Sequence, residues 1–308
     1  MLRRRVVIPF ALLAIVSSCA ATRPGTQRGA NIDTQSARVL RFERPLRAGA
    51  RFHVETGVTR TSRTVISIEG QSPRVEEAHF GARFEAEATV IAVSGTGLPH
   101  RVRYSIQRFE AEQDGALVST MPAGSTVDLT RATEPANAQI TVNGATVEPA
   151  VRDALSTVIT FGEGQPGTDE VFGGTTLRRP GYEWNAADRP AARRYADAIG
   201  LGSAFEAVAR FVGYTRVREV PCSEVDLTFS GPIAQEIPLP AAFTTRSSRI
   251  ESHARMRLPL DESVPVAQGV IELRTEVDAR GTIEGRVASF EARRNAVMNS
   301  VVLSVATP

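Results

Sequence analysis

Cysteine and histidine are the side chains best suited to nucleophilic or metal chemistry, and this chain has two cysteines and four histidines. The histidines lie far apart, at His53, His79, His100 and His253. Neither His-Glu-x-x-His nor Cys-x-x-Cys occurs, so no pair of ligands has the spacing of a metal site. Surface positions on strands are the favoured interpretation of all four histidines. A metal site assembled from distant strands stays open.

Other catalytic patterns are also absent from the sequence. It contains no Gly-x-Ser-x-Gly nucleophile elbow, and a chain without lysine cannot form a lysine-containing phosphate loop. Glu76 and Glu77 adjoin a segment of alternating charges, which indicates solvated carboxylates rather than an acid and base pair. The sequence therefore identifies no catalytic residue, no metal ligand and no cofactor.

The first cysteine follows a basic and then an apolar segment. Arg3 to Arg5 precede a run from Val6 to Val16 that has the order of a secretory signal and is too short to span a bilayer. The run ends in Val16-Ser17-Ser18-Cys19, which resembles the lipobox of bacterial lipoproteins. This resemblance implies a diacylglyceryl group on the Cys19 thiol, cleavage before Cys19 and acylation of the new amino group. An ordinary signal peptide, cut one or two residues later, is the alternative.

The same resemblance implies a location. Two or three acyl chains, at about 0.8 kcal/mol per buried methylene, make such an anchor effectively permanent. Cys19 is followed by Ala20, whereas an aspartate there favours retention in the inner membrane. For a Gram-negative source this implies the outer membrane, with the folded body in the periplasm or at the cell surface.

Composition and charge set the organisation of the chain. The net charge is +2, from 36 basic and 34 acidic residues, so nothing indicates a nucleic-acid partner. The segment after Cys19 is polar, rich in turn-forming residues and without periodicity, as in a flexible tether. The sequence thus predicts a signal peptide (1–18), a lipidated tether (19–36) and a β-rich body (37–308), which is one domain or two similar halves of about 37–165 and 170–308.

Alternation with a period of two dominates the body. From Phe80 to Ala92 the even-numbered side chains are apolar and most odd-numbered ones polar, and residues 101–106 alternate in the same way. These two segments predict an antiparallel hairpin. Its solvent face offers candidate ion pairs across the strands: Glu85 and Glu87 with Arg101 and Arg103. Further strands are predicted at 249–258, 271–277, 283–290 and 296–305, with a turn at Gly281.

The middle of the chain combines a hairpin with helices. Asn143-Gly144 is a strong hairpin signal, and Pro149 can begin an amphipathic helix to about residue 160. We expect this helix to fill most of the concave face of the sheet. Asn185 can cap a helix that ends at Ile199, and a capping box predicts another from Ser203 to Gly213. The predicted fold class is mainly β (α+β): antiparallel meander sheets, with an open half-barrel as one form, packed against a few short central helices.

Several segments of the body resemble a group of uncharacterised exported β-rich bacterial proteins. The resemblance rests on Asn143-Gly144 before a helix, on the segment from Arg178 to Trp184, and on Pro221-Cys222 before a strand and a long meander. It implies an architecture and no activity. From the residues themselves, Cys222 is interpreted as a small buried apolar side chain rather than a reactive thiol. Trp184 is interpreted as a plug between sheet and helices, with a ligand-stacking platform as the alternative.

These observations lead to three functional hypotheses. In the first, a lipoprotein binds a hydrophobic ligand or a partner protein, because the small alanines on the apolar strand faces leave room there. In the second, the body is a structural or assembly component of the cell envelope. The third is a hydrolase whose catalytic site is assembled from distant segments.

Overall fold

A computed structural model describes residues 36–44, 46–95, 97–131, 138–159, 167–234, 239, 243–262 and 267–304. The signal segment, Cys19 and the tether up to residue 35 lie outside this range, so their assignment stays a prediction.

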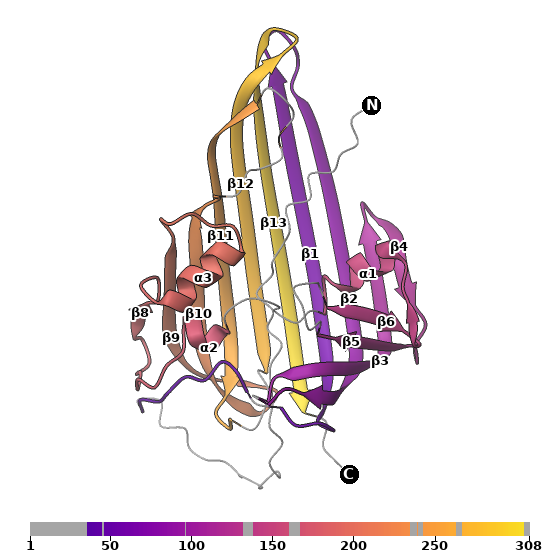
Figure 1. Cartoon of the computed structure of the whole chain (residues 1–308), viewed down its shortest axis with the longest axis vertical. Coiled ribbons are helices and arrows are strands. Elements are labelled where there is room, and N and C mark those ends of the chain that lie inside the picture. Colours follow the sequence, from indigo (N-terminus) through magenta and orange to yellow (C-terminus); the bar gives the residue numbers. More distant parts are fainter. Residues whose placement is uncertain are drawn as a thin grey trace.

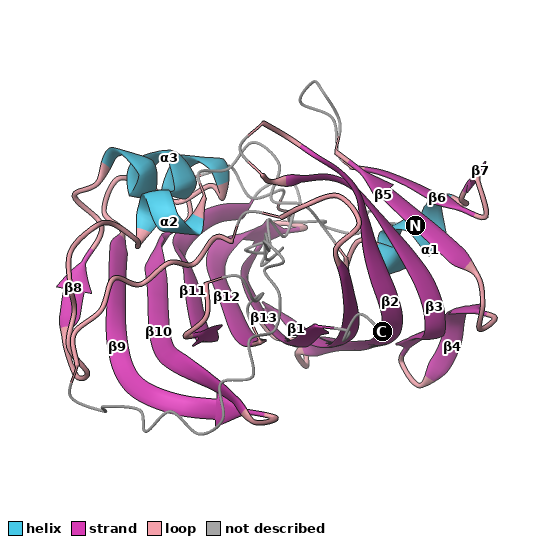
Figure 2. Ribbon diagram, turned by 90° about the horizontal axis from the view of Figure 1, so that it is seen from below, coloured by secondary structure: helices cyan, strands magenta, loops and turns pink. Residues whose placement is uncertain are grey.

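The described strands form one antiparallel sheet, which confirms that the chain is mainly β. The sheet has 13 strands in the order β7-β6-β5-β3-β2-β1-β13-β12-β11-β10-β9-β8, with β4 paired to β3 beside this path. It is strongly curved, and among the described strands its two ends do not pair (Figure 2). The strands are β1 (Arg51–Ile68), β2 (Arg74–Val93), β3 (Pro99–Gln113), β4 (Ala116–Met121), β5 (Thr126–Thr130), β6 (Gln139–Val142), β7 (Ala145–Thr146), β8 (Glu183–Asn185), β9 (Glu206–Val217), β10 (Val220–Pro232), β11 (Phe243–Pro259), β12 (Gln268–Ile283) and β13 (Arg286–Ser304).

The centre of the sheet is formed by the first and last of the described strands, β1 and β13 (Figure 1). β1 pairs with β13 along its length, from Phe52 opposite Ser304 to Ile68 opposite Ala288. The two strands predicted at 283–290 and 296–305 are therefore one long strand as far as Ser304. The turn before it lies at Glu284 and Gly285, both with positive φ, and not at Gly281. The Asn143-Gly144 hairpin is confirmed, with φ values of 50° and 79° at its turn residues.

The described helices are short and lie at the two flanks of the sheet. They are α1 (Pro149–Leu155), α2 (Thr168–Val171) and α3 (Pro190–Ala198). α1 lies near β4 and β5, whereas α2 and α3 lie at the flank of β9 to β11 (Figure 2). Leu155 and, beyond the end of α1, Val158 and Ile159 are buried. The expectation that this helix fills most of the concave face is not confirmed. Among the described residues no helix has the length and apolar character needed to span a membrane.

The helix predicted from Ser203 to Gly213 is wrong, because this segment forms most of β9. Ala207, Ala209 and Phe211 are fully buried and alternate with more exposed neighbours. β9 pairs with β10 on one side and with β8 on the other. The backbone hydrogen bonds of these two ladders outweigh the capping signal at Ser203, as tertiary context does for weak local preferences.

Candidate functional site

The concave face of the sheet is the largest apolar feature of the described structure. Alternate side chains of the central strands point into it and join one core cluster, which includes Val58, Phe84, Ile106, Leu227, Met256, Ile271 and Met298. The small side chains Ala82, Ala86 and Ala88 line the same face on β2. The period-two pattern from Phe80 onward therefore predicted the correct face and the correct strand.

A few polar side chains interrupt this apolar face near its centre. Thr56 and Ser300 face each other on β1 and β13, and their hydroxyl oxygens are 3.1 Å apart. On the same face of these two strands, Arg60 lies four residues from Thr56 and Arg294 lies six residues from Ser300. Neither arginine was predicted from the sequence as part of a site. The sequence does contain a signal for them, because each charge occupies a position where the period-two alternation of its strand calls for an apolar residue.

A segment before β1 crosses the open side of the curved sheet (Figure 2). We call residues 36–44 and 46–50 the strap. Its side chains Leu40, Phe42 and Leu46 are buried in the same core cluster as the concave face. Arg38 exchanges two backbone hydrogen bonds of 2.9 Å with Arg178 at one flank, and the other end of the strap bonds to backbone oxygens of the β2–β3 region. The strap therefore connects the two flanks of the sheet.

Polar contacts hold the strap in place. The Asp169 carboxylate accepts hydrogen bonds from the backbone N–H groups of Phe42 and Glu43, at 2.8 and 3.1 Å. The Arg44 guanidinium donates to the backbone oxygens of Pro259 and Asp261, at 3.0 and 3.2 Å. Backbone groups that enter a partly apolar interior need such partners, because an unsatisfied buried group is costly.

The acidic contact makes the strap sensitive to pH. Burial raises the pKa of Asp169, and burial followed by the nearby charges of Asp169 and Glu170 raises the pKa of Glu43. The attached strap thus binds more protons than the released strap. Its contribution to stability is complete below the unfolded pKa values of about 4 and is lost as pH rises through the raised values.

We therefore expect the Phe42 amide to lose protection from hydrogen exchange as pH rises above about 4, after correction for the intrinsic exchange rate. The Asp169→Asn variant should lose most of this dependence. Asp153→Asn changes a largely exposed carboxylate on α1 and should keep it. Equal pH dependence in wild type and Asp169→Asn would contradict this assignment.

Trp184 on β8 lies at the junction of sheet and helices, as predicted. Its indole Nε1 donates to the backbone oxygen of Phe172 at 3.0 Å, and the side chain is 8% exposed. The Arg178 guanidinium lies 3.9 Å from the ring centre, and the Tyr182 ring is stacked at 6.3 Å. These contacts support the role of a plug. A cavity of about 280 Å³ adjoins the indole and Phe205, so the stacking alternative stays open.

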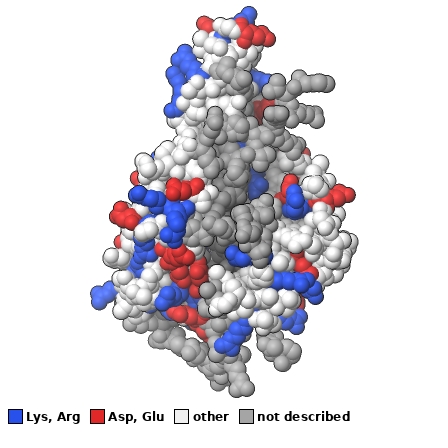
Figure 3. All heavy atoms as spheres, in the orientation of Figure 1, with Lys and Arg blue, Asp and Glu red and all other residues white. Residues whose placement is uncertain are grey.

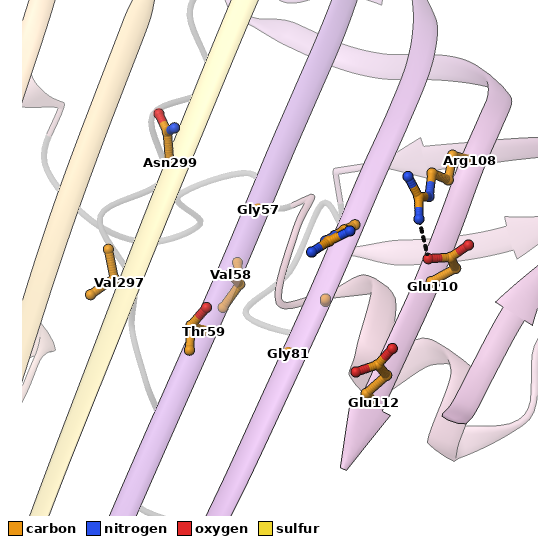
Figure 4. A pocket seen from close by; sticks show the side chains of 11 residues that line it. Gly57, Val58, Thr59, Gly81, Arg108, Glu110, Glu112, Val297 and Asn299 are labelled. Carbon is orange, nitrogen blue, oxygen red and sulfur yellow. Dashed lines mark hydrogen bonds and ion pairs between the residues drawn. The ribbon is translucent and has the colours of Figure 1, made fainter. Parts of the chain in front are cut away.

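A second cavity lies on the convex face. It has a volume of about 510 Å³, and Gly57 on β1 and Gly81 on β2 form part of its lining (Figure 4). A Cβ at either glycine would meet no atom within 4 Å, so the space above both is open. Arg108 and Glu110 form an ion pair of 2.7 Å at its rim. We call this cavity the convex hollow.

The predicted ion pairs of the hairpin differ from those observed. Arg101 and Arg103 both donate to Asp128 on β5, at 2.9 Å each, instead of pairing with the β2 glutamates. The bulge between Glu85 and Ala86 shifts the register of β2 against β3, and β5 supplies a carboxylate beside both arginines. These hydrogen bonds lower the pKa of Asp128. In the view of Figure 3, acidic and basic side chains are interleaved on both flanks.

The histidines and Cys222 form no site within the described part of the chain. No group of three metal-binding side chains occurs there. On the convex face, His53 lies 3.1 Å from Glu55 and His253 lies 3.9 Å from Asp226, and these two carboxylates also pair with Arg218 and Arg255. Cys222 is fully buried, and burial raises the pKa of its thiol to about 11. It therefore has the character of a small apolar side chain.

Comparisons with known proteins do not place the chain in a family. No protein-family model matches it, and no curated protein is similar to it in sequence. Among solved structures, lipovitellin, in a study of its lipid–protein interactions, has a TM-score of 0.33 at 9% identity. This match covers 85% of the chain and 26% of lipovitellin, so the chain spans about a quarter of that protein.

Two further solved structures show weaker likeness. DynF of the dynemicin biosynthesis pathway of Micromonospora chersina has a TM-score of 0.16 at 8% identity, over 91% of this chain and 94% of DynF. Outer membrane protein OprG from Pseudomonas aeruginosa has a TM-score of 0.17 at 6% identity, over 84% of this chain and 98% of OprG. At these scores none of the likenesses assigns a function to the chain.

Proposed function

We propose that the chain is an envelope lipoprotein, anchored through Cys19, that binds a hydrophobic ligand on the concave face of its sheet. The observation that carries the proposal is the extent of this face. It is apolar over much of the central strands, and the described helices lie at its flanks. Binding sites for hydrophobic ligands are concave and mostly apolar with a few polar groups, and this face has both properties.

The strap supplies a way for a ligand to enter. Leu40, Phe42 and Leu46 occupy part of the concave side and join its apolar cluster. The described backbone hydrogen bonds between the strap and its neighbours lie near its two ends, at Arg38 with Arg178 and at Leu46 to Ala50 with Gly97 and Val90. Its displacement would therefore uncover apolar surface without breaking the sheet. The strap also leads directly from the predicted lipid anchor into β1.

The proposal is tested with the full-length protein, purified in detergent from bacterial membranes and then exchanged into a non-binding detergent. Organic extraction and mass spectrometry identify any ligand that copurifies. Binding of the neutral fluorescent probe N-phenyl-1-naphthylamine then measures access to the apolar face. We expect saturable binding, with one probe or a small fixed number of probes per chain.

Two adjacent residues on opposite faces of β13 provide matched variants. Ala292 points to the concave side and is half-buried, whereas Arg293 points to the convex side and is exposed. Ala292→Trp should reduce probe affinity at least tenfold by occupying the face, and Arg293→Trp should leave it unchanged. Equal affinity in both variants, with unchanged melting temperatures, would reject the concave face as the binding site.

A docking role in envelope assembly is the second candidate, and the convex hollow favours it. This hollow lies on the exposed side of the central strands and combines charged, polar and apolar lining residues. Cross-linking in intact cells distinguishes the two candidates. Specific protein partners together with the absence of extracted lipid would favour docking over ligand carriage.

A further inference from the structure

The strap occupies apolar surface that a hydrophobic ligand of the concave face would need. Leu40, Phe42 and Leu46 are 1%, 2% and 4% exposed, and they belong to the same core cluster as the concave face. Their burial removes apolar surface from water, as the hydrocarbon part of a bound ligand would. The attached strap and a ligand therefore compete for the same surface.

Two acidic side chains fasten the middle of the strap to α2. The Asp169 carboxylate accepts hydrogen bonds from the backbone N–H groups of Phe42 and Glu43, at 2.8 and 3.1 Å. In return, the Glu43 carboxylate accepts hydrogen bonds from the backbone N–H groups of Thr168 and Asp169. It is seated so closely that a Cβ at Gly167 would collide with it. We call this reciprocal arrangement of Glu43 and Asp169 the clasp.

The charges around the clasp make it a proton-binding group. Burial raises the pKa of both clasp carboxylates, and the charges of Asp169 and Glu170 raise the pKa of the other one further. Arg41 and Arg44 of the strap act in the opposite direction on Asp169, and Glu170 is itself paired with Arg194 of α3 at 2.9 Å. Burial is the largest effect for both carboxylates, so the clasp binds protons more tightly while the strap is attached.

We propose that the strap is an autoinhibitory segment that excludes ligand from the concave face, and that ionisation of the clasp releases it. This inference rests on the proposed function, because it describes the regulation of the same face. As pH rises, the clasp loses protons that the attached state binds more tightly, so the balance moves toward the released strap. The fraction of chains that can bind ligand rises with it, and the apparent affinity rises in proportion.

Two variants of the full-length protein open the strap at constant pH. Gly167→Ala places a methyl group where the Glu43 carboxylate lies, and this end of a flexible side chain can move away at little cost to the fold. Phe42→Ser removes a buried apolar side chain from the strap. The matched controls are Gly95→Ala, where a Cβ meets no atom within 4 Å, and Val75→Ser, which makes the same kind of change at a position that is 47% exposed.

The readouts are affinity for the neutral probe N-phenyl-1-naphthylamine and the rate of limited proteolysis at the strap. We expect both opened variants to bind the probe at least about threefold more tightly than the parent and the controls to stay within about twofold of it, because only the former raise the released fraction. Cleavage should be faster in the same two variants. Faster cleavage without a gain in affinity would show that the strap does not exclude ligand. Unchanged cleavage would show that these contacts do not hold it, and either result overturns the proposal.

The dependence on pH tests the clasp itself. Probe affinity of the parent should rise at least about threefold from about pH 4 to pH 7.5, over the range in which the Phe42 amide loses protection from hydrogen exchange. Glu43→Gln/Asp169→Asn leaves no titratable group in the clasp, so its affinity should be nearly independent of pH. Glu76→Gln/Glu77→Gln removes two largely exposed carboxylates and should keep the dependence of the parent. Equal dependence in the parent and the clasp variant, or affinity that falls as pH rises, would reject the clasp as the switch.

The outcomes separate the inference from the proposed function. If neither the parent nor any variant binds the probe at any pH, the proposed function fails. If the parent binds the probe but the opened variants bind it no more tightly, only the inference fails. Melting temperatures identify any variant that has lost its fold. Gly167→Ala and Phe42→Ser release the strap by different routes, so the loss of one fold leaves the other variant as the test.

Discussion

Replacing Leu155 with aspartate should unfold the protein or lower its free energy of unfolding by at least about 4 kcal/mol. Leu155 is fully buried at the end of α1 and belongs to the main core cluster. Truncation of a buried leucine to alanine alone costs about 2–5 kcal/mol. The aspartate adds a carboxylate that must be desolvated or protonated in an apolar site. Urea denaturation followed by circular dichroism measures the change.

Ser156→Asp is the matched control, because it introduces the same charge one residue later at an exposed position. Apart from a small unfavourable effect at a helix C-terminus, of about 0.5 kcal/mol, its stability should equal that of the wild type. A Leu155→Asp variant with an unchanged melting temperature would show that α1 does not pack against the core.

The second large effect is expected at Trp184, where alanine should cost about 3–5 kcal/mol. The substitution removes an almost fully buried indole, its hydrogen bond to Phe172 and its contact with the Arg178 guanidinium. Arg178 would then keep its buried charge without the aromatic ring beneath it. Because Arg178 also pairs with Arg38 of the strap, the strap should be released more readily. Chemical denaturation and limited proteolysis at the strap measure the two effects.

Two other substitutions separate the contributions of this site. Trp184→Phe keeps an aromatic ring but removes the N–H donor, so it should cost less than alanine by at least about 1 kcal/mol. Tyr182→Ala removes the stacked ring, which is half-exposed, and should have a small effect. If Trp184→Ala were no more destabilising than Tyr182→Ala, the plug role would be wrong. The ligand-stacking alternative would then gain weight.

Much of the fold could be predicted where one face of a strand is apolar throughout. On β2 the residues from Phe80 to Val90 alternate without interruption, and burial follows the same alternation from Ala82 onward. The Asn143-Gly144 turn was predictable because its two residues accept positive φ values. The start of α1 at Pro149 was predictable for a similar local reason, since proline suits the first turn of a helix.

The strand at the centre of the sheet was not predicted, and its composition explains why. β1 has Phe52, Val54 and Val58 on its concave side, but Arg60 and Ser62 continue the same face. The polar residues break the alternation that identifies a strand. The strap has no secondary structure of its own and is fixed by contacts with distant segments, which local sequence does not encode. The candidate site therefore depends on β1 and the strap, whose structures are the hardest to predict from the sequence.

The pairing of β1 with β13 also determines when the fold can be completed. The central ladder joins the first described strand to the last, so its contacts have a very large sequence separation. Topologies dominated by such contacts fold slowly. Until β13 is in place, β1 and β12 each present a long unpaired edge, which is a hazard for aggregation. Synthesis proceeds from the N-terminus, so the strands β1 to β3 emerge long before β13, which joins them to the rest of the sheet. The sheet can therefore become continuous only when nearly the whole chain has emerged.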